Sequence, residues 1–366
     1  MSKQDAFFAL LRAGLWEKEV RLSPSDIIDF KDVYRLAEEQ SVVGLVAAGL
    51  EHVKDYRVPQ NVLLVFAGSA LQVERCNVSM NRFIERLSNT LNGAGIKFRL
   101  VKGQGVAQCY ERPLWRTCGD VDLLLDEENY EKAKQLLSPL ADIIENEDTD
   151  KLHVGFSIKS WTVELHGTLH GAWSKRVDNV IDEVQYDTCH KDGVRVWKNG
   201  KVNIFLPSPD NDVVLVFAHI LQHFFKGGVG LRQVCDWCRL IWTYRSEINA
   251  ERLERRLQLM GLESEWKAFA SLAVQTLGMN EEVMPLYSKK RIYKRKSEKI
   301  CSNILEYGNM GHNKDLSYQL RYKPIWRKIR TIGVYTNRCL KQSVIFPKDT
   351  FLVWWNMTKN GIKNFN

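Results

Sequence analysis

Two aspartates separated by one apolar residue, Asp120 and Asp122, constrain this chain more than any other feature of its sequence. Successive side chains of a β-strand point to opposite faces, so Val121, Leu123 and Leu125 can face a core while both aspartates share the other face. Neighbouring carboxylates repel each other. A divalent cation relieves that repulsion, and Mg²⁺ binds one or two carboxylates together with water and substrate phosphates. The pattern predicts a strand with a phosphate-handling metal site on its polar face.

A glycine turn precedes the aspartates. Residues 96–101 predict a strand, the sequence Lys-Gly-Gln-Gly at 102–105 interrupts it, and residues 106–110 predict a short helix. Glycine lets backbone amides approach phosphate oxygens, and a helix N-terminus adds positive potential. The turn matches neither the Walker loop nor the dinucleotide-binding fingerprint. We therefore expect the turn to contact phosphate, but the motif does not indicate a Walker-type nucleotide site or a dinucleotide site.

The order of glycine turn, short helix and Asp-Val-Asp strand resembles the DNA polymerase β-like nucleotidyltransferase superfamily. Gly103-Gln104 stands where that superfamily usually has Gly-Ser or Gly-Gly, and the gap to Asp120 is a few residues longer. Within the superfamily, the chain resembles a bacterial family of uncharacterised nucleotidyltransferases that is often associated with surface-polysaccharide gene clusters. That resemblance covers roughly residues 95–240 and rests on Lys102-Gly103, Tyr110, Pro113, Arg116 and Gly119-Asp120-Val121-Asp122.

A third acid is expected on a neighbouring strand. Residues 153–158 and 161–165 predict strands, and in the second of these Glu164 shares a face with Thr162 and His166. The segment Glu164-Leu165-His166 resembles the acid-apolar-His segment of the similar family. The resemblance implies that Asp120, Asp122 and Glu164 are catalytic and bind Mg²⁺ or Mn²⁺. An exposed acid on a solvent-facing strand is the alternative for Glu164.

The same resemblance implies a set of nucleotide-binding residues. An arginine fork suits bidentate phosphate contact, whereas lysine acts as a point charge. His219 and His223 lie four residues apart on one predicted helix face, but no glutamate follows His219, so the zinc-protease motif is absent. This helix is expected to close over the nucleotide. The candidate nucleotide-binding residues are Lys102, Gly103, Gln104, Arg116, His166, His223, Arg232 and Asp236.

The resulting fold class is α+β, with a small mixed-sheet nucleotidyltransferase core over residues 94–206. Helical regions over 1–93 and 207–366 flank this core. In the first region we expect a helix at 6–16, a second from Ser23 to about Leu50, and a long amphipathic packing helix after Pro59 that ends at Gly93. The apolar stripe of the long helix comprises Val62, Phe66, Ser69, Val73, Cys76, Met80, Phe83, Leu87 and Leu91.

Further helices begin after Asp126 and after Ser208, each of which is an N-cap residue type. Cys235 and Cys238 form the only Cys-x-x-Cys pair and are expected to pack on a helix face as reduced thiols, as are the other six cysteines. No apolar run approaches the ~18 to 20 residues of a membrane-spanning helix, so a cytoplasmic protein is expected.

The positive charge is concentrated near the C-terminus. Residues 289–341 contain fifteen Lys or Arg and three acids, a net +12, so within the total of +8 the rest of the chain carries −4. Tyr287, Tyr293, Tyr318, Tyr322, Trp326 and Tyr335 lie among these cations. Aromatics spread through a helical region are usually core, so we expect no specific nucleic-acid binding here.

These features together predict a metal-dependent nucleotidyltransferase that moves a nucleoside monophosphate from an NTP to an unidentified acceptor. The gene-cluster association of the similar family favours a glycan precursor. Two alternatives belong to other classes of protein. One is a catalytically inactive, nucleotide-binding regulatory module, suggested by Gly103-Gln104, and the other is an adaptor that uses the basic region to bind a polyanion or a membrane surface. The sequence carries no indication of oligomeric state.

Overall fold

A five-stranded mixed sheet lies between helical regions, and the predicted α+β class is confirmed. The computed structural model describes residues 3–23, 27–171, 174–191, 193–309 and 324–363. Strands β2 and β5 are parallel, and the other neighbouring strands are antiparallel. The order across the sheet is β1 (Arg99–Val101), β2 (Asp120–Leu124), β5 (Trp161–His166), β4 (His153–Ile158) and β3 (Ile143–Ile144).

One face of the sheet packs on two helices, α4 (Gln60–Gly93) and α6 (Glu127–Leu137). Val121, Leu123 and Leu125 are fully buried in this apolar cluster, as the alternation predicts. Asp126 caps α6 by accepting a hydrogen bond from the backbone N–H of Asn129. The aspartates of β2 are therefore left on the opposite face of the sheet.

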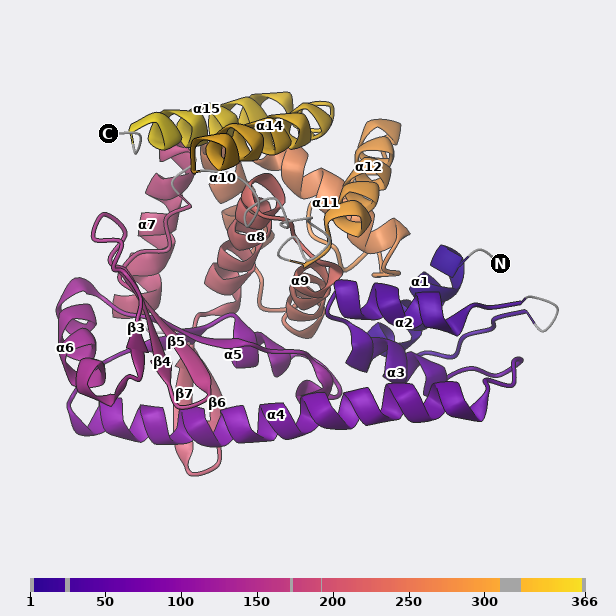
Figure 1. Ribbon diagram of the computed structural model, residues 1–366, viewed down its shortest axis with the longest axis horizontal. Helices are drawn as coiled ribbons and strands as arrows, with labels where there is room; N and C mark the ends of the chain where they lie inside the picture. The colour runs from indigo at the N-terminus through magenta and orange to yellow at the C-terminus, as the bar shows by residue number, and fades with distance from the viewer. Residues whose placement is uncertain (1–2, 24–26, 172–173, 192, 310–323, 364–366) are drawn as a thin grey trace.

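The long helix α4 connects the sheet to the N-terminal helices and extends along the whole base of the molecule (Figure 1). Phe66 and Met80 of the predicted stripe are buried, but Cys76 is exposed, and the polar Asn77 takes its place on the buried side. The Asn77 amide donates hydrogen bonds to the backbone oxygens of Leu114 and Arg116, at 2.7 and 2.8 Å. The prediction of a packing helix is confirmed, and this helix also holds the segment that precedes β2.

The N-terminal helices are α1 (Lys3–Trp16), α2 (Phe30–Glu39) and α3 (Val43–Glu51). The expected single helix from Ser23 to Leu50 is wrong in its start and its continuity. Residues 24–26 lie outside the described part of the chain, and α2 begins at Phe30, because Asp29 accepts from the first free backbone N–H groups. The buried Gln40 separates α2 from α3, where its side chain bonds the backbones of Leu231 and Ile304.

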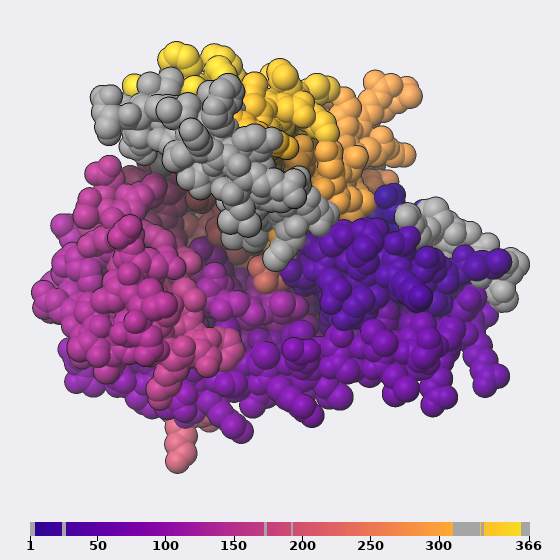
Figure 2. Space-filling model, in the orientation of Figure 1, coloured from indigo at the N-terminus to yellow at the C-terminus, as the bar shows by residue number. Residues whose placement is uncertain are grey.

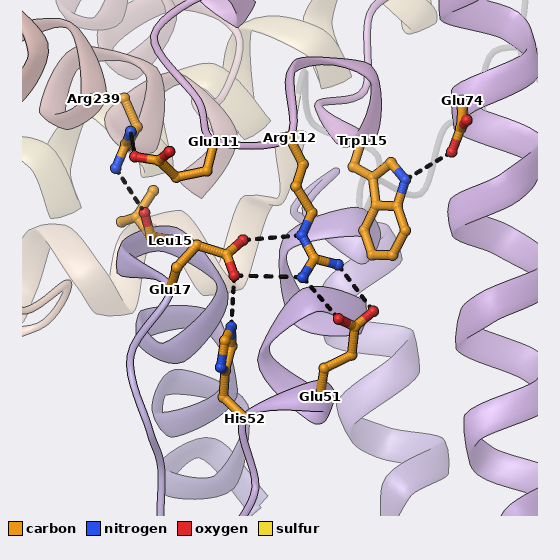
Figure 3. Close-up of polar contacts among 9 residues, drawn as sticks. All are labelled: Leu15, Glu17, Glu51, His52, Glu74, Glu111, Arg112, Trp115 and Arg239. Atoms are coloured by element: carbon orange, nitrogen blue, oxygen red, sulfur yellow. Dashed lines mark hydrogen bonds and ion pairs between the residues drawn. The ribbon is translucent and has the colours of Figure 1, made fainter.

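The segment between the glycine turn and β2 is fastened to both helical regions (Figure 3). It includes the short helix η1 (Pro113–Trp115). Arg112 forms ion pairs with Glu17 and Glu51, and the Trp115 ring donates a hydrogen bond to Glu74 of α4 at 2.9 Å. On the other side, Arg239 pairs with Glu111 and donates a hydrogen bond to the Leu15 carbonyl. These contacts fix the start of β2 relative to the flanking helices.

A helix and a hairpin complete the predicted core. Helix α7 (Lys175–His190) is followed by strands β6 (Arg195–Asn199) and β7 (Val202–Leu206), which form a separate two-stranded sheet. The inward residues of β7 join the apolar cluster under the main sheet. The tip of the hairpin extends past α4 at the surface (Figure 2).

The C-terminal helices pack on the N-terminal ones in a second and larger apolar cluster, in which Phe217, Trp237 and Trp266 are in ring contact. Cys235 and Cys238 are buried in it as free thiols. Of the helices that the structure describes, none has the length and apolar character that a membrane-spanning helix needs. The C-terminal helices are α8 (Pro209–Lys226), α9 (Leu231–Thr243), α10 (Ala250–Met260), α11 (Glu263–Gln275), α12 (Arg291–Tyr307), α14 (Pro324–Ser343) and α15 (Pro347–Lys363).

The basic region spans α12 and α14. Its residues 310–323, with Tyr318 and Tyr322 among them, lie outside the described part of the chain. Tyr293 packs against the large apolar cluster, as does Tyr335. These two aromatics are therefore core contacts, and the expectation of no specific nucleic-acid binding stays a prediction.

A buried pair of carboxylates gives α11 and α15 a pH-dependent contact. Burial, followed by the charge of Asp349, raises the pKa of Glu265 to about 7. Because the folded pKa lies above the usual 4.5, the folded state binds more protons between about pH 4.5 and 7, and the free energy of unfolding falls as pH rises through that window. Glu265→Gln should therefore stabilise the protein at pH 8 relative to wild type by roughly 2 to 3 kcal/mol and should have little effect at pH 4.5. Urea unfolding at both pH values measures this, and equal pH slopes for the two proteins would contradict it.

Candidate active site

Three carboxylates meet on the polar face of the sheet. The parallel register of β2 and β5 places Asp122 beside Glu164, and Asp120 lies two residues earlier on the same face of β2. One oxygen from each of the three carboxylates lies within 4.8 Å of the other two. The structure therefore brings together the three acids that the strand alternation suggested. A single cation could contact all of them.

The three acids differ in protonation behaviour because their partners differ. The pKa of Asp120 is raised, first by the charge of Asp122 and then by burial. Burial alone would raise the pKa of Asp122, but the Lys102 ammonium and the His166 hydrogen bond lower it below its usual value. Hydrogen bonds from His153 and His166 lower the pKa of Glu164. Asp120 is thus the carboxylate whose charge is least compensated by the protein.

The side chain of Lys102 extends from the glycine turn toward the three carboxylates. Its Nζ donates to Oδ1 of Asp122 at 2.8 Å, and this attraction more than offsets the effect of burial, so the pKa of Lys102 is raised. The backbone of Lys102 has a φ of 56°, which is rare for a residue with a side chain, and Gly103 follows with a φ of 33°. Such conformations persist where the surrounding structure holds them, and they cluster at functional sites.

The structure places the side chain of Gln104 away from the carboxylates. Helix α5 (Gly103–Ala107) begins three residues earlier than expected, so Gln104 lies in its first turn and points away from the carboxylates. Its side chain is 1% exposed and donates a hydrogen bond to Oδ1 of Asn77 on α4 at 2.8 Å. The side chain of Gln104 therefore fastens the turn to α4, whereas Lys102 and Gly103 border the cavity described next.

A cavity of about 670 Å³ opens over the carboxylates. Residues of helices α8 and α9 form one wall of this cavity, and the expected closure of this helical region over a nucleotide stays a prediction. His223 and Arg232 line this wall, together with His219, Gln222 and Lys226, which were not among the predicted site residues. Burial lowers the pKa of His223 to about 4, so its ring is neutral at pH 7. The α8–α9 wall thus carries neutral and cationic nitrogen groups together with the carboxylates of Asp212 and Asp236.

Arg116 and Asp236 border the cavity as a pair. Two nitrogens of the Arg116 guanidinium contact the two oxygens of Asp236 at 3.1 and 2.6 Å, and the Tyr110 hydroxyl donates to the same carboxylate at 2.7 Å. Both charged side chains are buried. Since Asp236 occupies the guanidinium fork, the contacts seen here link α9 to the segment before β2 and leave phosphate binding by Arg116 as a prediction.

His153 is the residue beside the acids that sequence reasoning missed. It lies directly opposite His166 in the β4–β5 register, and the two ring centroids are 4.8 Å apart. Its Nε2 is 3.3 Å from Oε2 of Glu164. The local sequence around His153 does not indicate that it contacts Glu164. That contact depends on how β4 pairs with β5, and Glu164 lies eleven residues further along the chain.

The cavity combines carboxylates on two adjacent strands with cations and a glycine turn. This combination is typical of enzymes that transfer phosphorus-containing groups. The mixed sheet with its flanking helices is consistent with a nucleotidyltransferase core. A family model described as "uncharacterised nucleotidyltransferase" matches residues 26–278. The match covers more than half of the chain, so the chain belongs to this family of nucleotidyltransferases and is a transferase. No curated protein and no solved structure matches it.

Proposed function

We propose that the enzyme transfers a nucleoside monophosphate from an NTP to an acceptor hydroxyl, with Mg²⁺ or Mn²⁺ held by Asp120, Asp122 and Glu164. The observation that carries this proposal is the cluster of three carboxylate oxygens within 4.8 Å of one another, which faces a cavity bordered by cations. In the transfer, a bond forms between the acceptor oxygen and the α-phosphorus. The bond from the α-phosphorus to the bridging oxygen breaks, pyrophosphate leaves with that electron pair, and the acceptor proton passes to water.

The donor set fits such a metal. Mg²⁺ and Mn²⁺ prefer oxygen ligands, and these three acids offer only carboxylate oxygens. The Asp120 carboxylate makes no hydrogen bond or ion pair in the part of the chain that the structure describes, and the charge of Asp122 raises its pKa. An added cation would relieve that repulsion. When bound, such an ion would neutralise phosphate charge and lower the pKa of the attacking hydroxyl.

The residues around the carboxylates would bind and orient the triphosphate. Lys102, Lys226 and Arg232 line the cavity and carry positive charge. The low pKa of Glu164 makes it a weak base, so it would serve as a ligand and would not remove the proton from the acceptor. We expect Lys102 to exchange its contact with Asp122 for a phosphate oxygen when the nucleotide enters.

Pyrophosphate release tests the proposal. The purified enzyme is incubated with each of the four NTPs and Mg²⁺, and with glycan precursors, RNA or protein as acceptor. We expect pyrophosphate in proportion to the labelled nucleotide that becomes attached to one acceptor class, and we favour the glycan precursors. Absence of pyrophosphate with every nucleotide and acceptor would count against nucleotidyl transfer.

Thermal stability gives a prediction that needs no acceptor. A ligand that binds only the folded state stabilises it by about 2.7 kcal/mol at roughly a hundredfold excess over Kd. NTP with Mg²⁺ should therefore raise the melting temperature, whereas NTP with EDTA should raise it much less, since the triphosphate would then face three uncompensated carboxylates. Differential scanning fluorimetry compares the two conditions. Equal shifts would mean that nucleotide binds without the carboxylate metal site.

A further inference from the structure

A second group of metal-binding side chains adjoins the three carboxylates. One ring nitrogen from each of His153 and His166 and one carboxylate oxygen of Glu164 all lie within 4.8 Å of one another. The two histidines come from neighbouring strands at directly paired positions, and Glu164 precedes His166 by two residues on the same face. Glu164 is therefore common to this group and to the group with Asp120 and Asp122.

The two separations that involve Glu164 match those expected around a tetrahedral ion. Zinc bonds to histidine nitrogen and carboxylate oxygen are about 2.0 to 2.1 Å long, so tetrahedral neighbours stand roughly 3.4 Å apart. Oε2 of Glu164 is 3.3 Å from Nε2 of His153 and 3.4 Å from Nε2 of His166. For the three atoms to bind one ion, Nε2 of His166 would give up its proton and its hydrogen bond to Asp122, and a fourth position would be left open to the cavity.

We propose that His153, Glu164 and His166 form a metal site for a transition ion of the Zn²⁺ or Co²⁺ class, next to the all-carboxylate site and sharing Glu164 with it. Imidazole nitrogen favours such ions, whereas Mg²⁺ prefers oxygen ligands and retains its water. The inference goes beyond the proposed transfer reaction and does not rest on it, because the site can bind its ion in the absence of nucleotide.

Another role for the two histidines makes a different prediction. His166 donates to Asp122 at 2.9 Å, and both rings contact Glu164, so the histidines could act only as hydrogen-bond partners of the acids. In that case neither histidine would be required for binding of a transition ion. Removing Asp120 would then disturb ion binding as much as removing His153.

Cobalt titration of the metal-free full-length protein distinguishes the two roles, because four- or five-coordinate Co²⁺ bound to nitrogen has an intense visible absorption spectrum. We expect wild type to develop this spectrum with one equivalent of Co²⁺ and to lose it when Zn²⁺ is added. His153→Ala and His166→Ala should each weaken Co²⁺ binding by at least about 100-fold, since loss of even an outer-shell partner costs 10- to 100-fold.

Two further variants serve as matched controls. Asp120→Asn should keep the cobalt spectrum, and so should His52→Ala, whose ring contacts Glu17 and does not line the cavity. His153→Gln keeps a polar side chain at this half-buried position, so the protein should stay folded. Loss of Co²⁺ binding in this variant would then not be caused by unfolding. A spectrum that survives in both cluster-histidine variants overturns the proposal, as does the absence of any spectrum in wild type. Neither result bears on pyrophosphate release, which is measured separately.

Discussion

Asp122→Asn should lower Mg²⁺-dependent NTP turnover by roughly a thousandfold or more while leaving the protein folded. The substitution keeps the shape of the side chain and removes the charge that Lys102 and His166 contact and that the proposed metal would use. Metal stabilisation of transition-state charge contributes several kcal/mol, and each 1.4 kcal/mol corresponds to about a tenfold change in rate. Pyrophosphate release per folded molecule, with circular dichroism as the check on folding, measures the effect.

A matched control changes a buried aspartate outside the cavity. Asp187 is as buried as Asp122 within a few per cent and pairs with Lys191 and Arg252. Asp187→Asn should reduce stability without reducing turnover per folded molecule. Wild-type turnover in Asp122→Asn, or an equal loss in both variants, would remove the carboxylate cluster from the mechanism.

Asp236→Ala should destabilise the protein by about 3 to 5 kcal/mol, the largest effect on stability that we expect. The substitution leaves the Arg116 guanidinium buried without its carboxylate, and it also deprives the Tyr110 hydroxyl of its acceptor. Breaking one side of a buried ion pair is costly because the remaining charge stays out of water. The free energy of unfolding in urea, determined by linear extrapolation, is the quantity to compare.

A double variant that removes the charges of both Arg116 and Asp236 distinguishes the cost of an unpaired buried charge from the cost of lost packing. Arg116→Met combined with Asp236→Leu replaces the pair by apolar groups, which is often close to neutral for stability. The double variant should recover most of the stability that Asp236→Ala loses. If it is no more stable than the single variant, the pair matters through its shape or through a ligand, and Arg116 regains its place among the phosphate-binding candidates.

Local sequence predicted the parts of the site that depend on one strand or one helix. Alternation in β2 and β5 indicated that Asp120, Asp122 and Glu164 share a face, because the period of a strand does not depend on its partners. The direction of Gln104 could not be predicted, since it depends on where α5 begins and on Asn77 of a distant helix. The contact of His153 with Glu164 depends on the pairing of β4 with β5, which local sequence does not encode.

The apolar cluster shared by the N-terminal helices and α8 to α11 has a consequence for synthesis of the chain. Arg12 and Trp16 donate hydrogen bonds to the carbonyls of Thr276 and Leu277, about 260 residues downstream. At a translation rate of about 5 to 20 residues per second, the first helices wait on the order of ten to fifty seconds for their partners. During that interval the side chains of α1 and α3 that face the C-terminal helices stay uncovered, and contacts of such long sequence separation also form slowly. A fragment of residues 1–93 should therefore bind a dye that reports exposed apolar surface far more strongly than the full chain does, and cells that make this enzyme would have to shield its beginning until its end has been made.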